Sequence, residues 1–461
     1  MSTLLESLLA ELTQALSPGS VLTGDDIAPR SHADWTQRNA CAPAALLRPS
    51  STEEVSTILR RCHAAGQPVV VQGGLTGLAG GATPRPGEVA LSLERLTGVE
   101  SVDPDGGTML VRAGTPLAIV QAAAEAHGLQ FPLDLGARGS CTIGGNISTN
   151  AGGNRVIRYG MTRELVLGVE AVLADGTIVS SLNAMLKNNA GYDLKQLFVG
   201  TEGTLGVVTR AVLRLHPAPR ERLTACVAVD SFGALVALLR ECRSALGGQL
   251  GSFETMWSDY YEFAVRELRV GARPFDAPHS HYAIVELESS DPPADRDRLE
   301  ALLSQLMESG VAADVVIAAS LDEAGRLWRV RDAAGELISR LSVPMSYDVS
   351  MPIARMAAYL ADIGVRTASV RGDRPLLVFG HLGDGNLHIV VDLGSVADVE
   401  ALDAHVYGAL AGFGSVSAEH GIGVLKRAWL STSRQPAEIT LMGTLKASLD
   451  PRGILNAGRV L

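Results

Sequence analysis

The sequence predicts a mixed α+β protein of about three parts, and three observations support this. The chain has 461 residues, which at about 150 residues per domain suggests roughly three domains. Hydrophobic residues make up 46% and charged residues 19% of the chain, as in a folded globular protein. Strand-like runs and helical patterns alternate along it, and the texture changes after a proline-rich linker at 216–219. We therefore expect domains over 1–219 and 220–424 and a helical carboxy-terminal segment over 425–461.

The amino-terminal elements alternate between helix and strand. The first twenty residues predict an amphipathic helix rather than a signal or transit peptide, because they carry Glu6 and Glu11 and no lysine or arginine. The sequence at 51–54 has the spacing of a capping box, and Gly66 ends the helix that follows it. The apolar run at 68–71 then predicts a short buried strand.

Later elements follow from turn signals and apolar periodicity. Residues 132–153 show little periodicity and predict a long loop, whereas Asp-Gly at 175–176 between apolar runs predicts a hairpin over 165–180. Residues 197–215 predict a loop followed by a strand. Beyond the linker we expect strands at 226–230, 282–287 and 315–319, and helices after Ser231, near 294–308 and around 322–340.

Charge and cysteine content exclude several classes of protein. The formal net charge is −11, with no basic block, which argues against a nucleic-acid partner. Five widely spaced cysteines do not form a disulfide scaffold, so we expect free thiols and a cytoplasmic location. The longest uncharged stretch, 62–84, is rich in glycine and contains glutamine, so it does not predict a membrane span.

Glycine is unusually frequent: 49 of 461 residues, or about 11%, against an average of about 7%. Two glycine-rich loops, at 72–82 and 139–153, offer many backbone N–H groups and few side chains, which suits the binding of a phosphate group. Neither contains the dinucleotide-binding or Walker pattern. Tight turns without a ligand remain the alternative interpretation.

Two histidines flank a turn that predicts a hairpin. Asp-Gly at 384–385 favours a two-residue turn, which would make His381 and His388 direct cross-strand neighbours on one face. Two imidazoles at that distance suit a divalent metal, and Glu419 beside His420 offers a further ligand. Strand and loop residues without a metal remain the alternative.

Four long segments resemble one known family. They are VVVQGGLTGLAGGA at 69–82, the glycine-rich run 132–160, NNAGYDLKQLFVGTEGTLGVVT at 188–209 and HLGDGNLH at 381–388. They are similar to segments of the FAD-linked oxidases with a vanillyl-alcohol-oxidase-type flavin domain. The similarity is greatest to D-2-hydroxyacid dehydrogenases of the D-2-hydroxyglutarate type, with the D-lactate type nearby. The resemblance implies a two-part FAD-binding domain, an α+β substrate (cap) domain carrying a metal site, and a carboxy-terminal segment that returns to the FAD-binding domain.

The resemblance also implies which residues bind FAD, and it implies noncovalent binding. The first loop would hold the pyrophosphate, through Gln72, Gly73, Gly74, Leu75, Thr76 and Gly77. A second group would lie beside the isoalloxazine and ribityl chain, namely Pro132, Ser140, Thr142, Gly145, Asn146 and Thr149. Gly203, Gly206 and Val208 would approach the adenine side, and Asn456 would close over the flavin.

The metal and substrate residues are implied in the same way. His381, His388 and Glu419 match the metal ligands, with zinc expected and manganese or cobalt as alternatives, and His420 matches the catalytic base. Arg331 matches the residue that pairs with the substrate carboxylate, and further substrate contacts are implied at Asn386, Ser346 and Tyr347. Where hydroxyglutarate dehydrogenases hold a second carboxylate with Thr and Lys, this chain has Gly335 and Ser346.

Together these expectations describe an FAD-dependent dehydrogenase. It would oxidise a D-2-hydroxyacid to the 2-oxoacid by hydride transfer to flavin N5. Its electrons would pass to a separate acceptor such as an electron-transfer flavoprotein or a quinone, and a homodimer is expected. The altered distal contacts make D-lactate or a larger hydrophobic D-2-hydroxyacid an alternative substrate. A noncatalytic flavoprotein subunit and a zinc hydrolase are alternatives from other classes.

Overall fold

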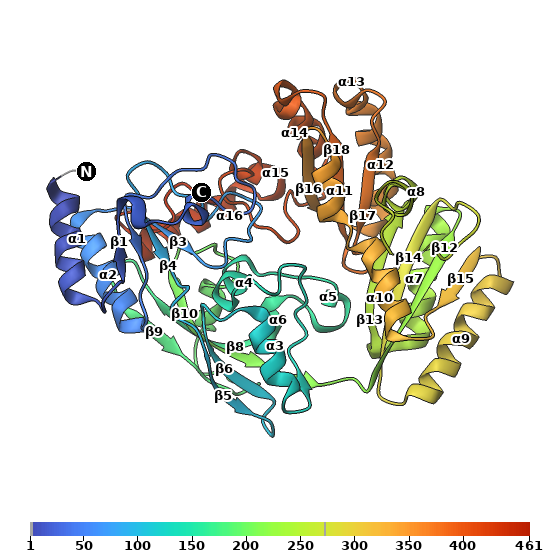
Figure 1. The fold of residues 1–461 in the computed structure, drawn as a ribbon, viewed down its shortest axis with the longest axis horizontal. Helices are drawn as coiled ribbons and strands as arrows, with labels where there is room; N and C mark the ends of the chain where they lie inside the picture. Colours follow the sequence, from blue (N-terminus) through green and yellow to red (C-terminus); the bar gives the residue numbers. More distant parts are fainter. Residues whose placement is uncertain (1–2, 272) are drawn as a thin grey trace. The chain divides into compact units, whose positions relative to one another are not determined.

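A computed structural model describes residues 3–271 and 273–461 and divides the chain into two compact units (Figure 1). The first comprises Met1–Gly153, Gly160–Ala218 and Glu419–Leu461, and the second comprises Asn154–Tyr159 and Pro219–Ala418. Residues 419–424, which the sequence assigns to the second domain, cluster with the first unit. The reason is visible in the backbone, because Val424 N donates to Ala79 O at 2.9 Å. Within the described residues, no helix combines the length and apolar character that crossing a membrane requires.

The first unit contains two main sheets. A four-stranded sheet has the order β1-β2-β4-β3, and a five-stranded antiparallel sheet has the order β5-β6-β10-β8-β9. The strands of the first are β1 (Val21–Leu22), β2 (Leu46–Leu47), β3 (Val69–Gln72) and β4 (Val89–Ser92). Those of the second are β5 (Val99–Asp103), β6 (Thr108–Arg112), β8 (Val166–Val172), β9 (Ile178–Ser181) and β10 (Val207–Arg214). A short pair joins β7 (Leu129–Gln130) to β11 (His216–Pro217).

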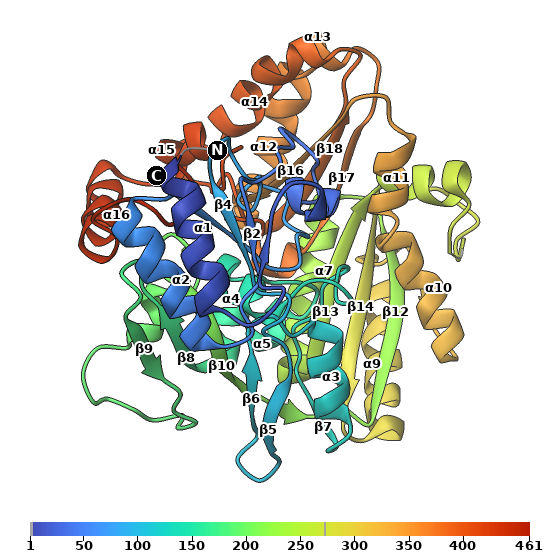
Figure 2. The same ribbon diagram turned by 60° about the vertical axis from the view of Figure 1, so that its left-hand side comes forward.

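The helices of the first unit include α1 (Thr3–Ala15), α2 (Thr52–Ala65), α3 (Leu117–Glu125), α4 (Ile143–Thr149), α6 (Thr162–Leu165), α15 (Leu430–Ser433) and α16 (Pro436–Leu449). Helices α1 and α2 lie side by side (Figure 2). Helix α2 begins as predicted, because Ser51 accepts a hydrogen bond from Glu54 N, and it ends at Gly66 with φ 63°. The predicted strands β3 and β10 and the β8–β9 hairpin are confirmed. The prediction of one long loop over 132–153 is wrong, because α4 forms within it.

The carboxy-terminal residues are built into the first unit. Leu455 pairs with Val69 beside β3, and Asn456 Oδ1 accepts from Val71 N at 2.8 Å. Arg459, which is only 1% exposed, donates to both oxygens of Glu88 at 2.7 Å. The four-stranded sheet therefore depends on residues far along the chain.

The second unit is one seven-stranded antiparallel sheet with helices on both faces. Its order is β15-β12-β14-β13-β17-β18-β16. The strands are β12 (Glu221–Val229), β13 (Leu250–Trp257), β14 (His281–Ser289), β15 (Asp314–Ile317), β16 (Pro344–Ser350), β17 (Leu376–Gly380) and β18 (Asn386–Asp392). The predicted strands at 226–230, 282–287 and 315–319 correspond to β12, β14 and β15.

The helices of the second unit are α5 (Val156–Tyr159), α7 (Phe232–Leu246), α8 (Ser258–Glu262), α9 (Pro292–Glu308), α10 (Leu321–Arg331), α11 (Ala334–Arg340), α12 (Ile353–Arg366), α13 (Ala368–Arg371) and α14 (Val399–Gly408). Apolar side chains of α8, α10 and α11 pack on one face of the sheet, where they meet Met256 of β13 and Phe379 of β17. Neighbouring residues of a strand point to opposite faces, so Glu254, two residues before Met256 in β13, lies on the same face as Met256 and Phe379.

Candidate functional site

Two glycine-rich loops of the first unit are in direct contact. A Cβ at Gly74 would lie 2.0 Å from Ser140 O, and a Cβ at Gly73 would lie 2.8 Å from Thr142 Oγ1. The obstacle at Gly74 is backbone, so glycine is required there for the close approach of the loops, whereas a side chain at Gly73 would need the Thr142 hydroxyl to move. The loop after β3 and the loop before α4, both predicted to bind the cofactor, are therefore brought together.

Three buried polar atoms around this contact lack a protein partner. Gln72 Oε1, Thr142 Oγ1 and Asn146 Nδ2 are buried without a hydrogen bond to any described residue. Buried polar groups are normally satisfied, so unpaired donors and acceptors beside a glycine-lined backbone are what a large polar ligand such as FAD would complete. The residues present thus fit the predicted cofactor.

The other predicted flavin-binding residues are distributed over the same unit. Asn456 Nδ2 donates to Glu202 O at 2.5 Å, so its amide joins β3 to the turn at Gly203. A Cβ at Gly206 would meet Phe198 Cε1 at 2.7 Å, and Val208 is buried in β10. The remaining ones lie in the two loops or at their ends: Leu75, with φ 59°, Thr76, Gly77, buried Pro132, exposed Ser140, and Gly145, whose carbonyl accepts from Thr149 Oγ1 at 3.0 Å.

Glu202, which was not predicted as a functional residue, anchors the loop that carries the predicted base. Its carboxylate accepts hydrogen bonds from Ile422 N at 2.6 Å and Gly423 N at 2.8 Å. Its own N–H donates to Ser148 O of α4 at 2.8 Å, and its φ of 53° is unusual for a residue other than glycine. Burial raises the pKa of Glu202, although the two backbone N–H groups act in the opposite direction. The loop with Glu419 and half-buried His420 is thus tied to α4 through one carboxylate.

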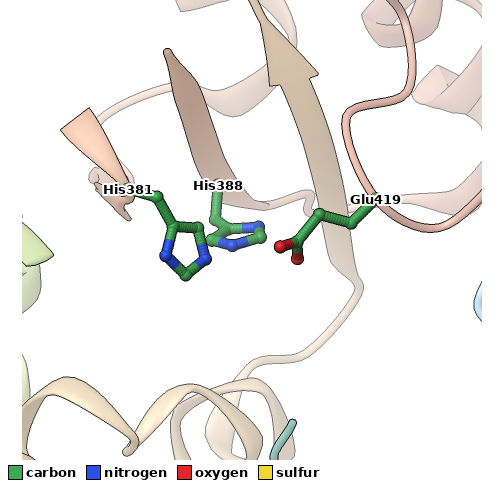
Figure 3. Close-up of side chains that lie close together, drawn as sticks. All are labelled: His381, His388 and Glu419. Atoms are coloured by element: carbon green, nitrogen blue, oxygen red, sulfur yellow. The ribbon is translucent and has the colours of Figure 1, made fainter. Parts of the chain in front are cut away.

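The three predicted metal ligands converge (Figure 3). His381, His388 and Glu419 each offer one ligand atom, and these atoms all lie within 4.8 Å of one another. Both histidines are buried and Glu419 is half-buried. Glu419 is also held by Gly153 N, which donates to its Oε1 at 2.8 Å. Two imidazoles and a carboxylate are a donor set that zinc and other divalent metals accept, so the residues fit a metal.

The predicted pairing of His381 with His388 is wrong, because each histidine pairs with a residue two positions away from the predicted partner. His381 exchanges backbone hydrogen bonds with Asn386, while His388 lies opposite Phe379 on one side and Asp348 on the other. The connection is a four-residue turn at 382–385 rather than a two-residue turn. Because the partner changed by two residues, both histidines keep the same face, and their ring centroids are 5.2 Å apart.

The turn between the histidines is braced within the second unit. Arg243 of α7 donates to Gly383 O. A Cβ at Gly383 would lie 2.6 Å from Ile157 Cδ1 of α5, so a larger residue there would require the Ile157 side chain to move. Gly385 has φ 86°, which suits glycine at the end of the turn. These contacts fix the backbone from which both histidines project.

A buried carboxylate connects the metal ligand to the predicted substrate-binding arginine. Glu254 of β13 is 1% exposed, and its Oε1 lies 2.6 Å from His381 Nδ1 while its Oε2 accepts from Arg331 Nε at 2.8 Å. Arg331 Nη2 lies 3.2 Å from His381 Nε2. The guanidinium also lies over the Phe379 ring, 5.2 Å from its centroid. Glu254 was not predicted from the sequence, in which it is the one charged residue of the run 250–257.

The pKa values of Glu254 and its neighbour Glu286 are shifted in opposite directions. Burial acts to raise the pKa of Glu254, but the electrostatic attraction and hydrogen bonds of His381 and Arg331 outweigh it and hold the pKa below its ordinary value. Burial raises the pKa of Glu286 on the adjacent strand β14, against the opposing effect of Arg155 and Arg222. Glu254 is therefore a carboxylate whose charge is matched by two cationic or polarised partners.

The remaining predicted substrate residues have different placements. Asn386 is buried, and both polar atoms of its amide lack a partner among the described residues. Ser346 is exposed and shares the face of His388. Tyr347 points to the opposite face, where its OH donates to Asp403 of α14 at 2.7 Å. The structure therefore does not bring Tyr347 to the metal ligands, because adjacent residues of a strand alternate in direction.

Comparison with known families covers most of the chain. The family described as FAD linked oxidases, C-terminal domain, matches residues 218–460, and the family described as FAD binding domain matches residues 43–181. D-2-hydroxyglutarate dehydrogenase of Xanthomonas citri pv. viticola is 41% identical over 93% of this chain and 91% of its own length. The mitochondrial D-2-hydroxyglutarate dehydrogenase of Bos taurus is 39% identical over 96% of this chain and 81% of its own length.

Solved structures share the fold at low sequence identity. p-Cresol methylhydroxylase superposes with a TM-score of 0.80 at 16% identity, covering 100% of this chain and 97% of its own. 4-Ethylphenol oxidase from Gulosibacter chungangensis has a TM-score of 0.77 at 17% identity, covering 100% and 97%. These are vanillyl-alcohol-oxidase-type FAD-binding proteins, so the fold that the sequence predicts is confirmed.

Proposed function

Because this chain belongs to the FAD-linked oxidase family, whose FAD-binding region it also carries, we propose that it oxidises D-2-hydroxyglutarate or a close analogue to the 2-oxoacid with the help of a bound divalent metal. Its class as an FAD-dependent hydroxyacid dehydrogenase follows from that membership and from the dehydrogenases to which it is similar. The convergence of His381, His388 and Glu419 within 4.8 Å supports metal assistance.

Arg331 would bind the carboxylate next to the hydroxyl group. Its Nε is committed to Glu254, so the two terminal nitrogens present N–H groups that can pair with both oxygens of a carboxylate. Asn386 has a buried amide without a hydrogen-bond partner in the described part of the chain, and it would complete the polar contacts of the bound acid.

His420 would accept the hydroxyl proton as general base, since a neutral imidazole can take a proton within hydrogen-bond reach. Bound FAD supplies the acceptor for the hydride from the α-carbon. His381, His388 and Glu419 would hold a divalent metal, which would supply a lowered pKa to a hydroxyl group bound at that site. Glu202 supports this step indirectly, because it holds the backbone of the loop in which His420 lies.

The distal end of the substrate is the point at which a second candidate arises. Gly335 offers no side chain and a Cβ there would meet nothing within 4 Å, and Ser346 is an exposed hydroxyl. Neither supplies the cation that a second carboxylate favours, and a charge-assisted hydrogen bond contributes about 1.5–3 kcal/mol. This favours D-lactate or a larger hydrophobic D-2-hydroxyacid as the alternative substrate.

Anaerobic flavin reduction tests both substrates. Purified holoenzyme is mixed with D- and L-2-hydroxyglutarate, D- and L-lactate and D-2-hydroxy acids with apolar chains, and bleaching of the flavin absorbance is followed. We expect the D-isomers alone to bleach the flavin, and D-2-hydroxyglutarate to have the highest second-order rate constant. A higher constant for an apolar acid selects the alternative. Absence of bleaching by every acid points to a noncatalytic flavoprotein.

Chelation and substitution test the two catalytic assignments separately. Removal of metal with EDTA should abolish flavin reduction, and zinc, manganese or cobalt should restore it; indifference to chelation contradicts the metal assignment. His420→Ala should retain FAD and metal yet lose flavin reduction. Unchanged reduction by this variant removes His420 from its role.

We also propose a cytoplasmic location, an electron-transfer flavoprotein or quinone as acceptor, and a homodimer. The five free cysteines are compatible with a reducing compartment. Reoxidation of the reduced flavin by purified acceptors tests the second proposal, and the mass in solution by light scattering tests the third.

A further inference from the structure

We infer that Glu254 is a positioning residue that couples the metal ligand His381 to the substrate-binding Arg331. The inference rests on the proposed function, because it concerns how the proposed metal and carboxylate sites are held. It adds a residue that neither the sequence pattern nor the family comparison singles out.

The carboxylate of Glu254 contacts both functional groups at once. Each oxygen of Glu254 has a different partner, with His381 Nδ1 at 2.6 Å from Oε1 and Arg331 Nε at 2.8 Å from Oε2. Glu254 is 1% exposed, so both contacts are shielded from water. Charge-assisted hydrogen bonds in such surroundings are strong and directional. One side chain on a central strand therefore sets the position of two functional groups.

The contact with Glu254 makes the two ring nitrogens of His381 chemically different. A carboxylate accepts from N–H, so the contact at Nδ1 places the proton on that nitrogen and leaves the lone pair on Nε2. Nε2 is then the atom available to a cation. Partners of this kind orient metal-binding histidines in general, and their loss typically costs about 10- to 100-fold in metal affinity or activity.

Arg331 extends the coupling to the substrate. Its Nη2 lies 3.2 Å from His381 Nε2, so the same lone pair is within reach of the guanidinium. A cation on Nε2 would take that lone pair and leave the Nη2 N–H for an anionic ligand. Glu254 holds the guanidinium through Nε meanwhile, so the arginine keeps its place. Metal and carboxylate ligand are therefore expected to strengthen each other's binding.

A purely structural salt bridge predicts a different outcome. If Glu254 only fastened α10 to the sheet, its replacement would lower stability without changing metal affinity in the folded protein. The informative measurements are therefore the metal affinity and whether the substitution changes KM by a larger factor than kcat.

Glu254→Gln is the decisive variant, because glutamine has the same size but offers only one accepting atom. Zinc affinity is measured on metal-free, FAD-loaded protein by competition with a chromophoric chelator, and flavin content reports the folded fraction. We expect zinc affinity to fall about 10- to 100-fold, and KM for the D-2-hydroxyacid to rise by a larger factor than kcat falls.

Glu286→Gln is the matched control. Glu286 is also a buried glutamate, on the adjacent strand and the same face, and Trp328 Nε1 donates to its Oε2 at 3.1 Å. This variant should keep wild-type zinc affinity and KM. Zinc affinity of Glu254→Gln within twofold of wild type overturns the inference, as does an equal loss in both variants.

A second variant covers the case in which Glu254→Gln does not fold. Glu254→Asp keeps the charge, but its shorter side chain cannot span both partners, so a smaller loss of zinc affinity is expected, and wild-type affinity overturns the inference. Absence of zinc binding by the wild type itself contradicts the proposed metal site instead, which separates the two failures.

Discussion

Replacement of Gly74 by alanine should detach the two glycine-rich loops and weaken FAD binding. A Cβ at this position would lie 2.0 Å from Ser140 O, whereas ordinary contacts begin at 3.4 Å, so the loops must separate by about 1.4 Å. The obstacle is backbone on the partner loop, which cannot rotate away as a side chain can. Overpacking of this kind typically costs about 1–3 kcal/mol. Because FAD binding would have to bring the separated loops back together, that cost would be subtracted from the binding free energy and would raise the Kd for FAD about 5- to 150-fold.

The assay is a fluorescence titration of deflavinated protein with FAD, with circular dichroism as a check on folding. Gly136→Ala is the matched control, because it lies in the second loop region, and a Cβ there would meet nothing within 4 Å. The control should bind FAD like the wild type. An unchanged Kd for Gly74→Ala would refute the idea that contact between the loops shapes the cofactor site.

Three further predictions concern the second unit. Arg331→Lys should raise KM about 10- to 150-fold, because a lysine lacks the fork that pairs with a carboxylate; steady-state kinetics that show an unchanged KM would contradict this. Tyr347→Phe should leave KM unchanged but lower stability in urea unfolding by about 1–3 kcal/mol, through loss of the hydrogen bond to Asp403, and a raised KM would return Tyr347 to the substrate site. Glu286 has a raised pKa in the folded state, so its own contribution to the stability of the wild type is lost as pH rises above its unfolded pKa of about 4.3. Glu286→Gln should therefore gain melting temperature relative to the wild type between pH 4 and pH 8, and a constant difference would refute the assignment.

Features that depend on local chemistry could be predicted from the sequence. The start of α2 at Ser51, its end at Gly66 and the β8–β9 hairpin each follow from capping or turn residues within a few positions. The shared face of His381 and His388 was predicted for a more general reason. Face depends only on whether a register is odd or even, so it survived an error in the turn.

Features that depend on distant partners could not be predicted in this way. Glu254 and His381 are 127 residues apart, and only the pairing of β13 with β17 brings them together. Glu202 likewise meets a loop about 220 residues further along the chain. Ser346 and Tyr347 were both predicted to contact the substrate because they are adjacent in sequence. Adjacent residues of a strand point to opposite faces, so Tyr347 points away from the face that Ser346 shares with His388.

The return of the carboxy-terminal residues to β3 has a consequence for synthesis of the protein. Val71 finds its partner Asn456 only 385 positions later, which at about 5–20 residues per second is a delay of roughly 20–80 s on the ribosome. All residues of the second unit, Asn154–Tyr159 and Pro219–Ala418, are synthesised before Asn456. The edge of β3 meanwhile stays open to other chains. The first unit is therefore expected to acquire its flavin only after residues 450–460 have emerged, and nascent chains arrested before that point are the ones most exposed to aggregation.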